Sequence, residues 1–255
     1  MAYNGKDILA LGIEAGPHMG AMITRANELG RCCIEDMVDL KPEPKLSLSE
    51  PLDIRVASDA APDAVVQSML ELSRTPVVKG VAVLPDACMA GPHWSITVGG
   101  VALSDGLHPG FHSAAICCSV MMSRSALSPR ELMDKIASVA HFGPGGRSEH
   151  RMSDALRKRV RSNKLLAEHE EVGDWHMGTQ GDGNHFSFVG VSASTGETRL
   201  VTHHGSRGFG ARLYKKGMGI AERYRRKLSP QTMKQNAWIP RGTDDFDEYW
   251  DALMI

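Results

Sequence analysis

Hydrophobic and polar residues alternate along the chain in two patterns, one typical of helices and one typical of strands. Apolar side chains that recur every three or four positions predict amphipathic helices. The clearest start is at Ser128, which can cap a helix that has Pro129 in its first turn and Glu131 to complete a capping box. The predicted helices are residues 17–29, 62–72, 128–140, 153–170, 211–228 and 243–255.

Short runs rich in β-branched residues and bounded by Gly or Pro predict strands. We expect buried strands at 77–85 and 95–104, and a hairpin made of 186–192 and 198–204 that turns near Gly196. Strands and helices interleave without a regular βαβ repeat. The chain is therefore predicted to be α+β, with mixed sheets and surrounding helices.

Length and charge exclude some classes of protein. The 255 residues carry a formal net charge of −1, so overall basicity gives no support for nucleic-acid binding. Two runs are nevertheless basic, 157–164 and 214–227, and 243–251 is acidic; each is either a solvated helix face or part of a functional surface. No apolar run approaches the ~20 residues of a membrane span, and the start does not resemble a signal peptide. We expect a cytoplasmic protein without membrane contact.

The five cysteines do not form the pattern of a secreted disulfide framework. Two adjacent pairs and a single residue are present, and no C-x-x-C pair that would indicate a structural zinc ribbon. We expect reduced thiols, available as metal ligands. The residues are Cys32, Cys33, Cys88, Cys117 and Cys118.

Two histidines flank the predicted hairpin. Residues equidistant from a hairpin turn face each other, so His185 and His203 should both lie at its open end. Converging imidazoles build metal sites, although a histidine beside a turn is also common as a purely structural residue. The surrounding glycines would let backbone N–H groups approach an anion such as phosphate. They are Gly181, Gly183, Gly205, Gly208 and Gly210.

A third cluster lies in residues 108–120. It contains His108, His112, Cys117 and Cys118, and thiolate together with imidazole suits Zn, Mn, Fe or Co. The alternative is that residues 115–120 form a buried strand whose cysteines behave as small hydrophobic side chains.

Four motifs together resemble the RtcB family of RNA-splicing ligases. They are VLPDACMAG (83–91), HPGFHSAAICCSV (108–120), GTQGDGNHF (178–186) and HHGSRGFG (203–210), in the order that the family has. The resemblance divides the chain into an N-terminal cap, 1–75, and an RtcB-like metal- and nucleotide-binding core, 76–255. Because the last helix stops abruptly at ALMI, we expect that core to be incomplete at its C-terminus.

The resemblance implies a ligase that depends on GTP and on Mn(II), with two metal ions in the family. Such enzymes join RNA ends that carry a 2′,3′-cyclic phosphate or a 3′-phosphate to 5′-hydroxyl ends. The family route passes through a guanylated histidine and an RNA-3′-pp-5′-G intermediate. Nucleophilic catalysis by the histidine is combined with metal ions that act as Lewis acids between phosphates.

The same resemblance implies roles for individual residues. Three side chains match metal ligands, and five residues match positions that bind the nucleotide cofactor, with Asn184 on its phosphate and Asp86 assisting. The metal ligands are Cys118, His185 and His203, and the cofactor residues are Asn184, Asp86, Ser206, Arg207 and Gly208.

Three departures from the family pattern predict an impaired ligase. Ala115 stands where the family has an aspartate ligand, and Phe188 stands where it commonly has an acid. No histidine follows His204, so the guanylated histidine is expected beyond the end of the chain.

Two alternatives remain open from the sequence. The chain could be a degenerate RtcB-like protein that binds RNA or nucleotide without ligating. It could also be a small hydrolase in which Cys118, His185 and His203 hold a single Zn(II) with one open position. Because the core is expected to be incomplete at its C-terminus, we expect the truncated face to expose apolar surface and to mediate self-association.

Overall fold

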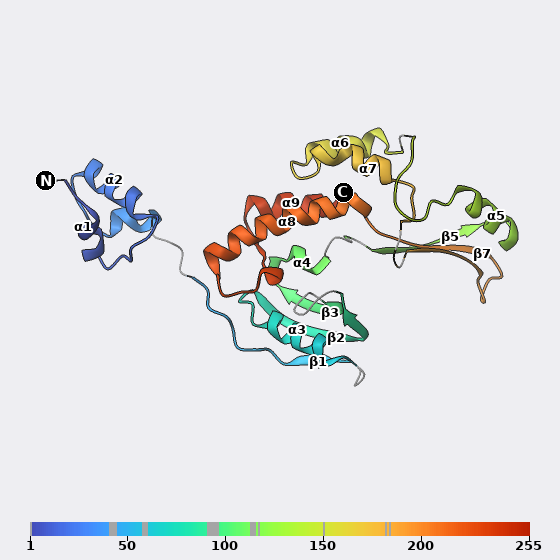
Figure 1. The fold of residues 1–255 in the computed structure, drawn as a ribbon, viewed down its shortest axis with the longest axis horizontal. Coiled ribbons are helices and arrows are strands. Elements are labelled where there is room, and N and C mark those ends of the chain that lie inside the picture. The colour runs from blue at the N-terminus through green and yellow to red at the C-terminus, as the bar shows by residue number, and fades with distance from the viewer. Residues whose placement is uncertain are drawn as a thin grey trace. The chain divides into compact units, whose positions relative to one another are not determined.

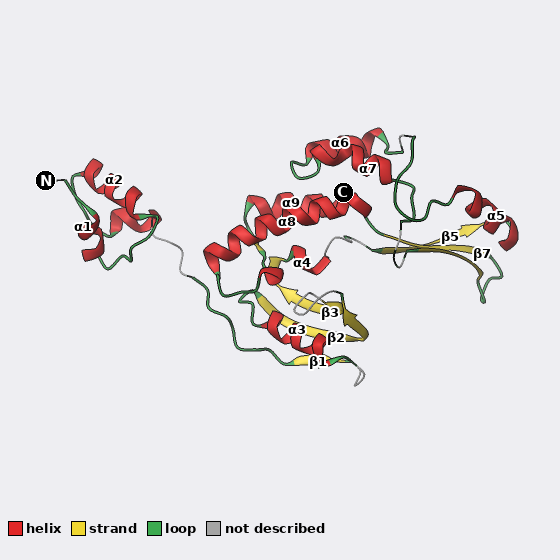
Figure 2. Cartoon of the chain, in the orientation of Figure 1, coloured by secondary structure: helices red, strands yellow, loops and turns green. Residues whose placement is uncertain are grey.

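Helices and mixed sheets are both present, which confirms the predicted α+β class (Figures 1 and 2). The computed structural model describes residues 2–40, 45–57, 61–90, 97–112, 116, 118–149, 151–181, 183 and 185–255. The chain divides into two compact units, Met1–Leu46 and Ser47–Ile255. The boundary at residue 75 between cap and core stays a prediction.

The first unit is a small helical body. Helices α1 (Gly5–Ala10) and α2 (Met19–Leu29) pack with the 3-10 helix η1 (Glu35–Leu40) around a core of buried apolar side chains. The predicted helix at 17–29 is confirmed as α2, which ends at Gly30 with a φ of 63°, a left-handed conformation that suits glycine. The core residues are Ile8, Ile13, Met22, Ala26 and Met37.

The second unit begins with a mixed sheet in the order β1-β2-β3. Strand β1 (Ile54–Val56) runs parallel to β2 (Val78–Met89), and β3 (Thr97–Ser104) runs antiparallel to β2. Helix α3 (Asp63–Ser73), predicted at 62–72, packs its buried apolar residues into the same core as β2. The expectation that 95–104 is buried is wrong for most of β3, because apolar side chains such as Leu103 are exposed.

A second sheet carries the hairpin, in the order β5-β7-β6. Strands β6 (Phe186–Val191) and β7 (Thr198–His204) pair as predicted, with Gly196 in the turn at a φ of 69°. Strand β5 (Ser119–Ser125) pairs with the other edge of β7, and α5 (Pro129–Val139) follows with both capping-box bonds of Ser128 and Glu131 formed. Cys118 is exposed, so the alternative of a buried strand that includes this residue is wrong.

Helices form the rest of the second unit. The elements are α4 (Pro109–His112), α6 (Asp154–Ser162), η2 (Ala167–His169), α7 (Glu170–His176), α8 (Arg207–Leu228), η3 (Lys234–Asn236) and α9 (Asp244–Met254), with a short pairing of β4 (Gly106–Leu107) and β8 (Ile239–Pro240). Helix α7 packs against the first turn of α8, where Gly173 lies next to the ring of Phe209. The buried apolar core of this part of the unit includes Leu166, Leu213, Ile220, Ile239 and Tyr249.

Two predicted helices have different bounds in the structure. The stretch 153–170 is not one helix, because Asn163 leaves the helical conformation and its side-chain amide donates to the carbonyl oxygen of Glu248 at 3.0 Å. Helix α8 begins at Arg207 rather than 211, directly after the Gly-rich turn. Two side chains of the basic run 157–164, Arg157 and Arg161, form ion pairs with Glu170 and so have a structural role.

His108 is a buried structural histidine of this unit. Its Nδ1 donates to the carbonyl oxygen of Asn236 at 3.0 Å, so the hydroxyl of Ser104 donates to Nε2, at 2.7 Å. Its ring stacks on Phe111, with ring centroids 4.7 Å apart. Burial lowers the pKa of His108 to about 4, and the hydrogen bond to Asn236 opposes that shift only in part.

The fold should therefore lose stability in mild acid. Between the unfolded pKa of 6.5 and the folded value of about 4, the unfolded chain binds a proton that the folded chain does not. We expect the free energy of unfolding to fall by about 3 kcal/mol as the pH drops through this window. Urea unfolding at several pH values measures it, and His108→Phe should flatten the dependence. An unchanged slope in that variant would contradict the assignment.

Candidate metal and nucleotide site

The open end of the hairpin brings two imidazoles together. His185 directly precedes β6, and Phe186 pairs in register with His203 on β7. The centroids of the His185 and His203 rings are 5.7 Å apart. His185 Nδ1 donates to the carbonyl oxygen of Gln180 at 2.7 Å, which leaves its Nε2 with a free lone pair. His203 Nε2 is buried and has no hydrogen-bond partner.

Cys118 approaches the same place from β5. Ser119 pairs with His204, which brings Cys118 beside Gly205. A Cβ on Gly205 would lie 3.1 Å from His185 Nε2 and 3.5 Å from Cys118 Sγ, so the imidazole and the thiol border one small space. Within the described part of the chain, however, no group of three or more His, Cys, Asp or Glu residues is close enough to hold a metal ion as it stands.

The turn after β7 places Arg207 next to His185. Arg207 is the one non-glycine residue with a positive φ, 56°, among those described, a conformation that costs about 1–3 kcal/mol. Its Nη2 donates to the carbonyl oxygen of Gly143 at 3.0 Å. A Cβ on Gly181 would lie 2.6 Å from Arg207 Nη1 and 2.7 Å from His185 Nδ1, so guanidinium and imidazole meet over this glycine.

Ser206 and Gly208 stand at the start of α8. Ser206 occupies the N-cap position but makes no capping bond, and its buried Oγ has no partner. The first N–H groups of a helix lack partners within the helix and, with the helix dipole, favour an anion there. The structure thus brings Ser206, Arg207 and Gly208 together where the sequence analysis expects a phosphate.

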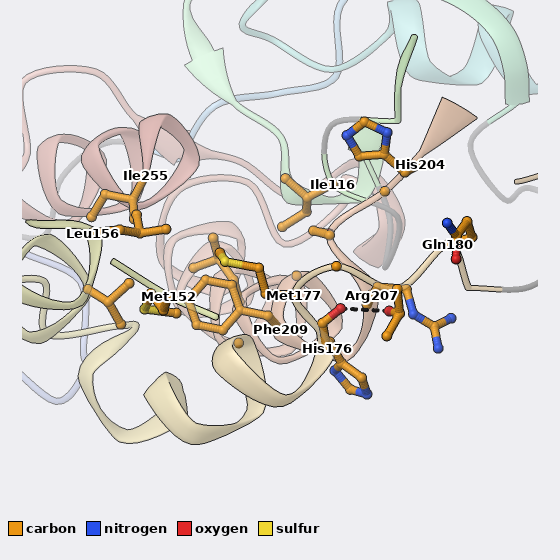
Figure 3. Close-up of a pocket in the computed structure, with 18 of the residues that line it drawn as sticks. Ile116, Met152, Leu156, His176, Met177, Gln180, His204, Arg207, Phe209 and Ile255 are labelled. Carbon is orange, nitrogen blue, oxygen red and sulfur yellow. Dashed lines mark hydrogen bonds between the residues drawn. The ribbon is translucent and has the colours of Figure 1, made fainter. Parts of the chain in front are cut away.

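A cavity of about 600 Å³ opens beside this turn, lined at one end by polar side chains and elsewhere by apolar ones (Figure 3). The polar end includes His176, Gln180, His204 and Arg207. The apolar walls come mainly from α6, α8 and α9, and include Met152, Leu156, Phe209, Leu213 and Ile255.

His176 is a site residue that the sequence analysis missed. It lies at the C-terminal end of α7, lines the cavity, and its buried Nδ1 has no partner. Its ring lies against Gly208, where a Cβ would be 2.7 Å from His176 Cε1. Burial lowers the pKa of His176, and Arg207 and Arg212 act in the same direction. The one feature of the sequence that could have indicated this role is the position of His176, two residues before the GTQGDGNHF motif that begins at Gly178.

Two predicted cofactor residues are not placed at this site. Asp86 is exposed on β2 and is not among the described residues that line the cavity. Asn184 lies outside the described residues, as does Ala115. The roles of Asp86 and Asn184 therefore rest on the motif alone.

Comparison with known proteins finds similarity to one family. The family model described as tRNA-splicing ligase RtcB matches residues 141–255. Two curated relatives are RNA-splicing ligase RtcB of Escherichia coli strain K12 and RNA-splicing ligase RtcB1 of Escherichia coli strain ATCC 25922. Each is 24% identical over 213 residues, which cover 73% of this chain and 51% of the relative.

The chain thus spans about half the length of the curated relatives that it matches.

No helix among the described residues is long and apolar enough to cross a membrane. The matched region contains the imidazole pair, the Ser206–Gly208 turn and most of the cavity wall. Residues 141–255, which include His185, His203 and the turn, are thus similar to the RtcB family.

Proposed function

We propose that this chain is part of an RtcB-type RNA ligase that uses GTP and Mn(II). Its substrates would be RNA ends with a 2′,3′-cyclic phosphate or 3′-phosphate, joined to 5′-hydroxyl ends. The family-model match over residues 141–255 and the names of the two relatives support RNA ligation. The motifs around His185 and His203 support the finer chemistry.

One observation carries the proposal: His185 lies beside His203, with ring centroids 5.7 Å apart, and borders the same small space beside Gly205 as Cys118. These three residues would hold the metal ion. His203 Nε2, which is buried without a hydrogen-bond partner, and His185 Nε2 each offer a lone pair that could coordinate such an ion. The hydrogen bond from His185 Nδ1 to the carbonyl oxygen of Gln180 holds the imidazole ring in place, as the second ring nitrogen of a metal-binding histidine commonly does. A bound metal ion would supply a Lewis acid for a phosphoryl oxygen.

The residues of the turn would orient the nucleotide. Arg207 offers a guanidinium for a phosphate, since guanidinium groups match phosphate oxygens in a bidentate manner. The first N–H groups of α8 would add hydrogen-bond donors for an anion. The apolar wall of the cavity adjoins this end of the site.

A single-metal hydrolase is the second candidate, favoured by the donor set itself. Cys118, His185 and His203 are three protein ligands, and three ligands with an open position are typical of catalytic zinc. Phe188 and Ala115 remove carboxylates that the family pattern would add, and oxygen donors are what Mn(II) prefers. Thiol and imidazole donors alone favour Zn(II).

Cellular context is also a proposal. The described cysteines Cys32, Cys33, Cys88 and Cys118 are free, as expected in a reducing compartment, and we propose a cytoplasmic location. Self-association through exposed apolar surface remains a prediction.

Labelled GTP tests the nucleotide site. We expect the chain with Mn(II) to retain α-labelled GTP in equilibrium dialysis but to carry no label after denaturing electrophoresis, because no histidine follows His204. Arg207→Gln should weaken retention about tenfold, the cost of a charge-assisted hydrogen bond. Equal retention by this variant, or no retention by the parent chain, would contradict the proposal. A labelled band would show that a nucleophile lies within these residues.

A further inference from the structure

Exposed aromatic side chains gather around the loop that leads to His185. Phe142 forms a bridge with Gly181, Trp175 lies just before the loop, and Phe186 and Phe188 follow it on β6. All four are exposed, and the one other exposed Phe or Trp among the described residues is Trp250 on α9. The concentration beside one loop indicates a binding surface rather than scattered surface residues.

Phe186 and Phe188 lie on one face of the β5-β7-β6 sheet. Residues paired directly across strands share a face, so Val120 and His203 accompany Phe186. By the same register, Met122 and Val201 accompany Phe188, and Arg124 and Arg199 follow at the next pair. Phe188 is 57% exposed and Met122 66% exposed, so this face is open to solvent. We call it the aromatic face.

Charge on these strands favours an anionic partner. The three strands contain Arg124, Arg199, His203 and His204 but no Asp or Glu. Glu197, in the turn, forms ion pairs with both arginines. An apolar stripe that ends in Arg124 and Arg199 suits a polyanion that also carries flat apolar groups. A partner that has only negative charge, or only aliphatic groups, would use one part of this surface and not the other.

The aromatic face also joins the candidate metal site directly. The ring of Phe186 meets that of His203 edge to face, with centroids 5.5 Å apart. Phe186 and Phe188 are two residues apart on a strand, so their Cα atoms repeat at about 7 Å along the face. RNA-binding sheets of another fold use aromatic side chains on an open face to stack successive bases in the same way.

We propose that Phe186 and Phe188 stack the last bases of a single-stranded RNA end and so position its terminal phosphate beside His185 and His203. Arg124 and Arg199 would contact the RNA backbone farther along the face. This inference rests on the proposed function, because it takes RNA as the substrate.

Fluorescence anisotropy with a labelled single-stranded RNA of about 12 nucleotides that ends in a 3′-phosphate tests the proposal. We expect Phe188→Leu, which keeps the site apolar but removes the ring, to weaken binding about tenfold. The salt dependence of RNA binding should be the same in Phe188→Leu as in the parent chain. Arg124→Gln should instead lower the slope of log binding constant against log salt concentration by about 0.7. Trp250→Leu is the matched control, an equally exposed aromatic residue on α9, and should bind RNA as the parent does.

The outcomes separate this inference from the function on which it rests. If the parent chain binds no RNA at low salt, the proposed function fails and the stacking surface with it. If the parent and Phe188→Leu bind RNA equally, stacking is overturned while the function stands. If Phe188→Leu instead changes the sedimentation coefficient and leaves RNA affinity intact, a polypeptide covers the face, and the stacking role is likewise overturned.

Discussion

Replacing His203 with alanine is expected to weaken Mn(II) binding by at least about 100-fold, since even the loss of an outer hydrogen-bond partner of a metal ligand costs up to that much. His203 Nε2 is buried without a partner, and its ring lies beside that of His185. Isothermal titration with Mn(II) measures the loss. Thermal unfolding without metal should change little, because the variant removes a buried group that makes no hydrogen bond through Nε2.

His204→Ala is the matched control for this prediction. His204 is the next residue of β7, and successive side chains of a strand point to opposite faces, so it should not be a ligand. Metal affinity should stay within about threefold of the parent chain, the scatter of a substitution that removes no ligand. If His204→Ala and His203→Ala lose affinity equally, the imidazole pair is not the metal site.

Replacing Asp174 with alanine is expected to lower the free energy of unfolding by about 3–5 kcal/mol, the cost of removing one partner of a buried ion pair. Asp174 is 3% exposed. Its Oδ1 accepts from the backbone N–H groups of Arg151 at 2.8 Å and Met152 at 2.6 Å. Its Oδ2 accepts from Arg157 at 2.9 Å. Without the carboxylate these donors lose a partner, and α7 loses its link to the segment before α6.

Urea unfolding measures this effect, and Glu171→Ala is its control. Glu171 is an exposed acid of the same helix, so its removal should change stability by less than about 0.5 kcal/mol. Because α7 carries His176 and part of the cavity wall, Asp174→Ala should also weaken the retention of GTP. A loss below about 1 kcal/mol in Asp174→Ala would contradict the structural role given to this residue.

Elements with local signals could be predicted from the sequence. Ser128 and Glu131 cap α5 through bonds within one turn, and Thr243 caps α9 in a similar way. The hairpin needs only its turn and the pairing of neighbouring segments, so the meeting of His185 and His203 followed from counting residues. In each case the atoms that determine the structure lie close together in the chain.

Features that depend on distant partners could not be predicted. The break at Asn163 arises from bonds to Glu248 and Asp251, which are more than 80 residues away. Cys118 reaches Gly205 because β5 pairs with β7, a contact with no local signal. His176 joins the site through the packing of α7 on α8, and it resembles any other helix-terminal histidine in the sequence.

A Co(II) titration tests most directly the central claim that Cys118, His185 and His203 hold a single metal ion. Thiolate ligation gives Co(II) a strong near-ultraviolet charge-transfer band. We predict that this band saturates at one Co(II) per chain and is lost in both Cys118→Ser and His203→Ala. A parent chain without the band, or a band that survives both substitutions, would contradict the account.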